Sequence, residues 1–187
     1  EHLDSIAIQT PPAFVYSPVA ELMLGDAKPM QVSIAFSGVF FILVDIEQLQ
    51  ASGTYPEAAI RPEGANEMAA LGVRILEAAN HGFDVQHPEN PGIDAIELVM
   101  IYQEAGIGRG RDIVINRRGG IDRSPCGAGT GAKVTDLFVR DKLQENQEYT
   151  LESFIGTQFI GRVLEPAEVG PYQGAVPEIR GTAHITG

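Results

Sequence analysis

The sequence is short of cysteine, of positive charge and of long apolar runs, and each shortage excludes a class of protein. A single cysteine in 187 residues leaves no internal disulfide framework and favours a reducing compartment, so we expect a cytoplasmic protein. The formal net charge of −12, from 13 basic and 25 acidic residues, disfavours nucleic acids and anionic membranes as partners. The longest apolar run, residues 39–44, is far shorter than the roughly 20 residues of a membrane-spanning helix.

The length and the composition are those of an ordinary folded domain. Apolar residues make up 44% and charged residues 20% of the chain, which excludes a disordered or fibrous protein. A chain of this length buries enough surface to fold without covalent cross-links. It opens with Glu1 rather than an initiator methionine, and we expect it to be a piece of a longer protein.

The spacing of apolar residues predicts several strands and two helices. Apolar residues recur at steps of three and four in residues 63–79 and in the stretch after Cys126, which predicts two helices. Residues 18–29, with a proline near each end, are the predicted linker. Strands are predicted at residues 5–9, 14–16, 31–43 (with a bulge at Gly38), 93–101 and 111–115, and repeatedly within 149–187. Because strands and helices do not alternate regularly, we expect an α+β fold with antiparallel pairing.

The apolar positions also predict which face of each helix is buried. We expect the first helix to pack one stripe against the sheet, with Glu63 or Asn66 near its cap and Gly82 after its end. The residues predicted to be buried are Met68, Leu71, Ile75, Leu76 and Ala79 in the first helix and Val134, Leu137, Phe138 and Leu143 in the second. On the other side of the second helix, Lys133, Asp136 and Arg140 are predicted to face water.

Residues 122–132 have the residue types of a reactive site. Pro125 and the glycines after it place Cys126 at the N-terminus of the second helix. The unpaired N–H groups and the dipole of a helix N-terminus favour a thiolate, so we expect the pKa of Cys126 to lie below its ordinary value. The small residues that follow leave those N–H groups open to an anion. Asp122 can hold an ammonium group, so the stretch offers the three features that an α-amino acid requires.

Other interpretations of this stretch stay open. A lone cysteine is often simply a small buried apolar residue. Gly127, Gly129 and Ala132 have the spacing of a dinucleotide fingerprint, but Pro125 precedes them where a buried strand is required. A cysteine hydrolase would need a partner histidine. The histidines of the chain are His2, His81, His87 and His184.

We expect neither a metal site nor a nucleic-acid site. His81, Asp84 and His87 lie where a helix ends and a proline-rich turn begins, which favours surface positions over a metal centre. The densest basic cluster is interrupted by glycines and an aspartate and contains no aromatic residue, so we interpret it as a solvated loop. Its members are Arg109, Arg111, Arg117 and Arg118.

The reactive stretch resembles a motif of a known family. Residues 122–130 read Asp-Arg-Ser-Pro-Cys-Gly-Ala-Gly-Thr, which is similar to the second catalytic motif of the proline racemase and hydroxyproline epimerase family. Four further segments resemble family segments and follow in the same order. They are residues 32–45, 87–89, 156–162 and 181–187. The resemblance therefore covers nearly the whole chain, and its central motif is specific.

The resemblance implies a fold and a missing part. The family has two similar α+β lobes, and the implied lobe is diaminopimelate-epimerase-like, an antiparallel β sheet wrapped around a central helix. Residues 1–27 would be the end of the first lobe and a linker, and residues 28–187 the second lobe with the Asp-Arg-Ser-Pro-Cys-Gly motif. The family's other cysteine, in a Cys-Gly-His motif, would precede Glu1, and the family's closing strand would follow Gly187. The missing first lobe of the same protein is the expected partner, and a homodimer stays open.

The resemblance also implies the chemistry. It implies an isomerase, a racemase or epimerase that needs no pyridoxal phosphate, other cofactor or metal and inverts the α-carbon of the imino acid proline or 4-hydroxyproline. Cys126 would be one of two catalytic cysteines, and Asp122, Gly127 and Ala128 would bind the substrate. Two-base inversion needs a base on each face of the α-carbon. We therefore expect this chain alone to be inactive.

Three positions depart from the family pattern. Ser37 stands where glycine is usual, Ala128 replaces threonine or serine, and Asn116 stands where an aromatic residue often lines the pocket. Asn116 leaves the imino acid undecided among proline, 4-hydroxyproline and 3-hydroxyproline. Two alternatives stay open, a truncated or non-catalytic family fragment and a relative of trans-3-hydroxyproline dehydratase. Cys126, where the dehydratases commonly have threonine, favours the racemase or epimerase.

Overall fold

The computed structural model describes residues 5–53 and 55–182, and within them the chain forms nine strands and three α-helices. The strands are β1 (Ile6–Gln9), β2 (Ala13–Leu22), β3 (Met30–Ser37), β4 (Val39–Asp45), β5 (Ile96–Glu104), β6 (Arg109–Asn116), β7 (Tyr149–Ser153), β8 (Gln158–Val169) and β9 (Tyr172–Gly181). The helices are α1 (Ile46–Ser52), α2 (Ala65–Gly82) and α3 (Gly127–Val139), with one turn of 3-10 helix, η1 (Pro62–Gly64).

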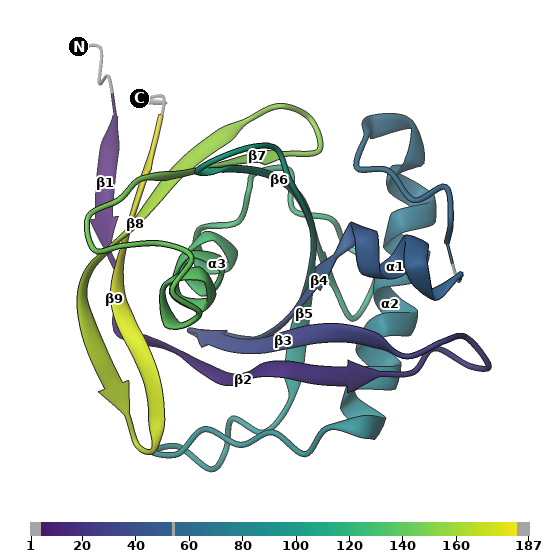
Figure 1. Cartoon of the computed structure of the whole chain (residues 1–187), viewed down its shortest axis with the longest axis horizontal. Coiled ribbons are helices and arrows are strands. Elements are labelled where there is room, and N and C mark those ends of the chain that lie inside the picture. The colour runs from purple at the N-terminus through teal and green to yellow at the C-terminus, as the bar shows by residue number, and fades with distance from the viewer. Residues whose placement is uncertain (1–4, 54, 183–187) are drawn as a thin grey trace.

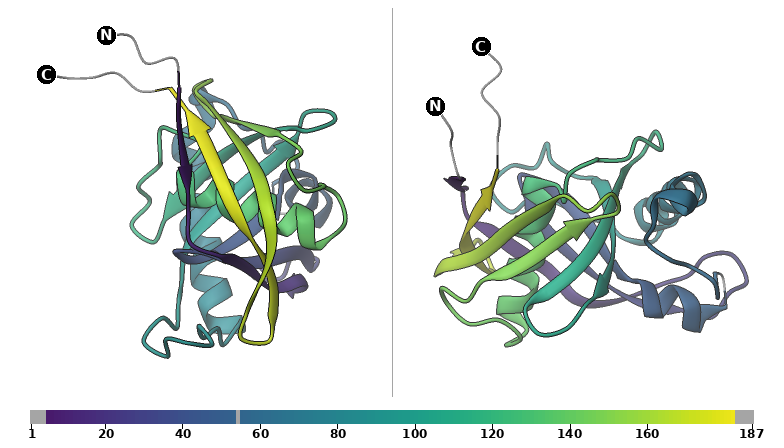
Figure 2. Two further views of the ribbon diagram at one scale, coloured as in Figure 1. Left: turned by 90° about the vertical axis from the view of Figure 1, so that its left-hand side faces the viewer. Right: turned by 90° about the horizontal axis from the view of Figure 1, so that it is seen from above.

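All nine strands of the described residues form one sheet that closes on itself. Their order is β1-β9-β2-β3-β4-β5-β6-β7-β8, and β8 also pairs with β9, so the strands form the ring visible in Figure 1. Both β1 and β2 pair with β9, and Figure 2 shows β1 running beside it. The sheet is mixed, because β4–β5 and β6–β7 are parallel. The prediction of antiparallel pairing was therefore wrong for two pairs, which are the two whose crossovers contain α-helices.

Two further sequence predictions fail in the first hairpins. Residues 31–43 do not form one bulged strand, because Gly38 has a φ of +78° and turns the chain tightly between β3 and β4. Residues 18–29 do not form a linker between lobes, because they contain the end of β2 and the turn that leads into β3, which begins at Met30. The described residues on both sides of residue 27 thus belong to the same sheet.

Helix α3 lies inside the ring of strands, and α1 and α2 lie outside it (Figure 1). Two apolar cores result: α2 packs on the outer face of the sheet, and α3 packs against the inner face. Because strands surround α3, the side chains of Lys133 and Asp136 are buried. The prediction that Lys133 and Asp136 face water was wrong, since it assumed a helix covered on one side only.

Helix α2 has the buried stripe that its sequence predicts. All five residues of the stripe, Met68 to Ala79, are buried. Its N-terminal cap is Gly64, with no side-chain hydrogen bond, and its C-terminal cap is Phe83, so the predicted capping residues were wrong. Gly72 lies against β6, where an added Cβ would be 2.8 Å from the side chain of Ile115.

No helix among the described residues is both long enough and apolar enough to cross a membrane. The short helix α1, which the sequence analysis did not predict, begins at its cap Asp45, whose Oδ1 accepts a hydrogen bond from Glu47 N at 3.0 Å.

Candidate active site

Cys126 is the N-terminal cap of α3, as the sequence predicts. Its backbone has φ +61° and ψ +113°, a conformation that non-glycine residues rarely adopt and that often marks a functional residue. Its Sγ accepts a hydrogen bond from Gly129 N at 3.3 Å. An added Cβ at Gly129 would lie 2.7 Å from Met100 Cε and 3.2 Å from Cys126 Cβ, so a side chain there would require Met100 to shift. The turn is therefore packed so that the thiol lies against the first N–H groups of the helix.

Asp122 is held in place by Ser124. Its Oδ1 accepts hydrogen bonds from Ser124 N and Ser124 Oγ, both at 2.9 Å, and Cys126 N in turn donates to Ser124 Oγ at 3.1 Å. The backbone N–H of Asp122 is anchored on Val114 O at 2.9 Å. Ser124 therefore links the carboxylate to the cysteine, a role that the sequence analysis missed.

The four predicted site residues lie in two neighbouring cavities. A cavity of about 290 Å³ has Cys126 and Asp122 in its wall, together with Leu98, Val114, Asn116, Gly120 and Ile121. Gly127 and Ala128 lie instead in the wall of a larger, mainly apolar cavity of about 680 Å³, between β1, the β3–β4 turn and β9. The space beside Gly127 is open, since an added Cβ would have no atom within 4 Å.

The thiol of Cys126 is more weakly acidic than the sequence predicts. It is 8% exposed, and its pKa is raised to about 12, chiefly because burial disfavours the thiolate. The hydrogen bond from Gly129 N lowers the pKa, but the carboxyl groups of Asp122 and Asp112 raise it. The prediction of a lowered pKa was therefore wrong, because it considered the helix N-terminus without the desolvation and the acidic neighbours.

Asp112 is a buried acid that the sequence analysis missed. It lies on β6 and is 0% exposed, and neither of its carboxyl oxygens has a hydrogen-bond partner among the described residues. Burial, together with the charge of Asp122, raises its pKa well above the ordinary value. A carboxyl in the apolar run Asp112-Ile113-Val114-Ile115 was the available signal, because strand interiors rarely contain an acid.

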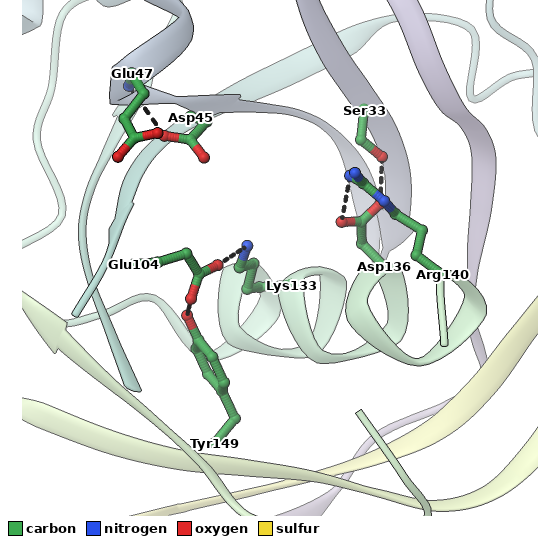
Figure 3. Close-up of polar contacts among 8 residues, drawn as sticks. All are labelled: Ser33, Asp45, Glu47, Glu104, Lys133, Asp136, Arg140 and Tyr149. Carbon is green, nitrogen blue, oxygen red and sulfur yellow. Dashed lines mark hydrogen bonds and ion pairs between the residues drawn. The ribbon is translucent and has the colours of Figure 1, made fainter. Parts of the chain in front are cut away.

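A second group of polar contacts fastens α3 inside the sheet (Figure 3). Lys133 Nζ donates to Glu104 Oε1 at 2.8 Å and lies 3.3 Å above the ring of Tyr102. Tyr149 Oη donates to the other carboxylate oxygen of Glu104 at 2.7 Å. Nearer the end of the helix, Asp136 accepts hydrogen bonds from Ser33 Oγ at 2.5 Å and from Arg140 Nη1 at 3.5 Å. These contacts bind the helix that carries Cys126 to β3, β5 and β7.

The histidines within the described residues lie away from these cavities. His81 Nδ1 is 2.7 Å from Glu77 O, and His87 packs its ring on Phe14 and Phe36 at 5.3 and 4.6 Å. His2 and His184 lie outside the described residues. Within residues 5–53 and 55–182, no three His, Cys, Asp or Glu side chains come together in a way that could hold a metal ion.

Comparison with known proteins identifies the family of the chain. A sequence model of the proline racemase family matches residues 1–187. The proline racemase of Acetoanaerobium sticklandii is 34% identical over 100% of this chain and 55% of its own length. The trans-3-hydroxy-L-proline dehydratase of Bacillus thuringiensis subsp. konkukian is 30% identical over 99% of this chain and 54% of its own.

The same result comes from a solved structure. A hydroxyproline epimerase from Agrobacterium vitis, with bound trans-4-hydroxy-L-proline, superimposes with a TM-score of 0.89 and 28% sequence identity, over 100% of this chain and 52% of that one. The chain thus spans about half the length of the relatives that it matches. The family match covers every residue of the chain, which therefore belongs to the proline racemase family.

Proposed function

We propose that the protein to which this chain belongs is a cofactor-independent racemase or epimerase that inverts the α-carbon of proline or 4-hydroxyproline. The observation that carries the proposal is the cavity of about 290 Å³, whose wall contains both Cys126 and Asp122. Its volume is at the lower end of the range for small-molecule sites. A racemase and a hydroxyproline epimerase are among the relatives.

In the proposed reaction Cys126 is one of two bases. A thiolate on one face removes the α-proton, so that the C–H bond breaks and an S–H bond forms. The thiol on the other face gives up its proton, so that a new C–H bond forms and its sulfur becomes a thiolate. Because its pKa is raised, Cys126 carries its proton before the reaction begins. This fits the role of the thiol that donates the proton. The other cysteine would come from the first lobe.

The remaining site residues would hold the substrate. The carboxylate of Asp122, oriented by Ser124, would bind the ring ammonium. The N–H groups of Gly127 and Ala128 belong to the first turn of α3, where they have no partner within the helix. They would bind the substrate carboxylate and stabilise the charge that develops on it. Ala128 keeps its N–H group, although it lacks the threonine hydroxyl common in the family.

We propose the missing first lobe of the same protein as the partner of this chain, whose described residues would form a diaminopimelate-epimerase-like second lobe. The relatives are almost twice as long as the chain. The apolar cavity beside Gly127 and Ala128 is edged by the exposed side chains of Ile6 and Ile8. A covering lobe would shield this surface and exclude water from the substrate.

The test is exchange of the α-hydrogen in the whole protein. Incubated in deuterium oxide with L-proline or trans-4-hydroxy-L-proline, the protein should replace the α-hydrogen with deuterium and form the other stereoisomer, as followed by proton NMR and chiral chromatography. The Cys126→Ser variant is the matched control and should lose at least about a thousandfold in rate. Release of water from trans-3-hydroxy-L-proline without inversion would instead identify a dehydratase, and equal rates in the two proteins would refute the role of Cys126.

A further inference from the structure

We propose that Asp112 is a positioning residue of the candidate site, whose buried carboxyl group acts through space on the Cys126 thiol and keeps the thiol proton in place. The inference rests on the proposed function only in that Cys126 is taken as the reactive group. It assigns a role to a residue that makes no hydrogen bond with the described residues and lies outside the 122–130 motif.

The position of Asp112 on β6 directs its side chain toward α3. Ile113 and Ile115 pack in the outer core against α2, whereas Val114 packs in the inner core that contains Cys126. Because side chains alternate along a strand, Asp112 faces the same side as Val114. Val114 is itself part of the wall of the Cys126 cavity. Asp112 is therefore the next inward-facing residue along the strand from that cavity.

No cation of residues 5–53 and 55–182 neutralises Asp112. Its partners in the sheet are Tyr102 on β5 and Ser153 on β7, and no Arg or Lys contributes to its pKa shift. Lys133, the nearest buried cation on α3, is bound to Glu104 instead. A buried carboxyl without a hydrogen bond or a counter-ion is costly. Such a group needs an explanation in terms of function rather than stability.

Among the described residues, the titratable groups that face Asp112 are all acids. They are Tyr102 and Tyr149 from the neighbouring strands, Asp122 from the loop and Cys126 from the beginning of α3. Both tyrosines have raised pKa values, chiefly because they are buried, and stay neutral when Asp112 and Cys126 titrate. Like charges in one poorly hydrated interior repel each other. Once Asp112 has ionised, its charge opposes loss of the thiol proton.

The test is the pH dependence of Cys126 alkylation in the whole protein. Iodoacetamide labelling would be followed by mass spectrometry on the tryptic peptide of residues 124–133, which contains Cys126 and no other cysteine. In Asp112→Asn the rate-against-pH curve should move to lower pH by about one unit, which is about a tenfold faster reaction on its rising limb. Asp94→Asn removes the same charge from an exposed position and should leave the curve unchanged.

The readout separates positioning from a structural role and from the proposed function. A merely structural role would change the urea midpoint of Asp112→Asn and leave the alkylation curve in place, which would overturn the inference. If Asp112→Asn does not fold, the smaller neutral variant Asp112→Ser carries the same test. Because alkylation needs no substrate, a shifted curve in a protein without racemase activity would support this inference and refute the proposed function.

Discussion

At the scale of single residues, Cys126 combines a strained backbone with a protected thiol. The positive φ aims Sγ back at Gly129 N, and burial and the two neighbouring aspartates keep the proton on the sulfur. Such a thiol is better suited to donate a proton as a general acid than to attack electrophiles as a nucleophile.

We expect Cys126 to be alkylated slowly at neutral pH. With a pKa raised to about 12, the thiolate fraction at pH 7 is far below that of a free cysteine, whose pKa is about 8.5. Iodoacetamide should label the native protein with a rate that still rises above pH 9, whereas urea-unfolded protein should be labelled with the ordinary midpoint. A native midpoint at or below 8.5 would contradict the buried thiol. The unfolded thiol ionises first as the pH rises, so the native state should also lose stability above about pH 8.5.

At the scale of elements, α3 is held by a charged contact inside an apolar ring. The side chain of Lys133 is 1% exposed, whereas that of its partner Glu104 is 43% exposed. Burial lowers the pKa of Lys133, and Glu104 opposes that shift. The two ions are therefore unequally hydrated. The carboxylate is partly exposed to water, whereas the buried ammonium contacts the carboxylate and the ring of Tyr102.

We expect removal of the anion to cost more stability than removal of the cation. Glu104→Gln leaves the buried ammonium of Lys133 without a counter-ion and should lower the free energy of unfolding by about 3–5 kcal/mol. Lys133→Met keeps a stem of similar length and leaves a hydrated Glu104, so its effect should stay within about 1 kcal/mol. Urea denaturation of both variants is the measurement. The reverse order would mean that water reaches Lys133.

Helix α2 allows a test of close packing between helix and sheet. Alanine is favoured over glycine in helices by about 1 kcal/mol, but at Gly72 an added Cβ would lie 2.9 Å from Ile115 Cβ. We expect overpacking to outweigh the helix propensity, so that Gly72→Ala lowers the free energy of unfolding by about 1–2 kcal/mol. Gly82→Ala, at the open end of the same helix, is the control and should be neutral or slightly stabilising. Equal thermal midpoints for the two variants would show that Ile115 on β6 shifts to accommodate the added methyl group.

The two long helices show what the sequence can and cannot predict. The buried stripe of α2 follows from local periodicity, because only one side of that helix meets the sheet. Periodicity does not predict which side chains of α3 are buried. Their burial depends on the closed ring of strands, which the pairing of β8 with β9 completes and which cannot be deduced from local sequence. In the site, proline and glycine predicted that Cys126 begins a helix. The pKa of the thiol is raised chiefly by its burial and further by Asp112, which the fold brings near from another strand.

At the scale of the whole molecule, the chain has a site with one open side. The cavity in front of Gly127 and Ala128 is large and mainly apolar, and Ile6 and Ile8 are 41% and 61% exposed at its edge. Exposed apolar surface of this kind marks an interaction site. The candidate substrate site and the exposed apolar surface are therefore neighbours.

We expect the 187-residue chain by itself to have no racemase or epimerase activity. It contains one cysteine, and a single base returns a proton to the face from which it came. Without the first lobe, water would also weaken the hydrogen bonds to the substrate carboxylate. Chiral chromatography on L-proline and trans-4-hydroxy-L-proline should show no turnover above a Cys126→Ser control. Turnover clearly above the control would mean that another residue of this chain serves as the second base.

The closure of the sheet by β9 has a consequence for synthesis on the ribosome. Strand β9 is the last described strand to be translated, yet it pairs with β1, β2 and β8 and so joins segments that are far apart in the chain. Such pairings form late and slow folding. Until β9 emerges, the ring of strands around α3 is incomplete. A nascent chain stalled before residue 172 therefore lacks the strand that closes the ring, and the helix that carries Cys126 is enclosed when the last hairpin is complete.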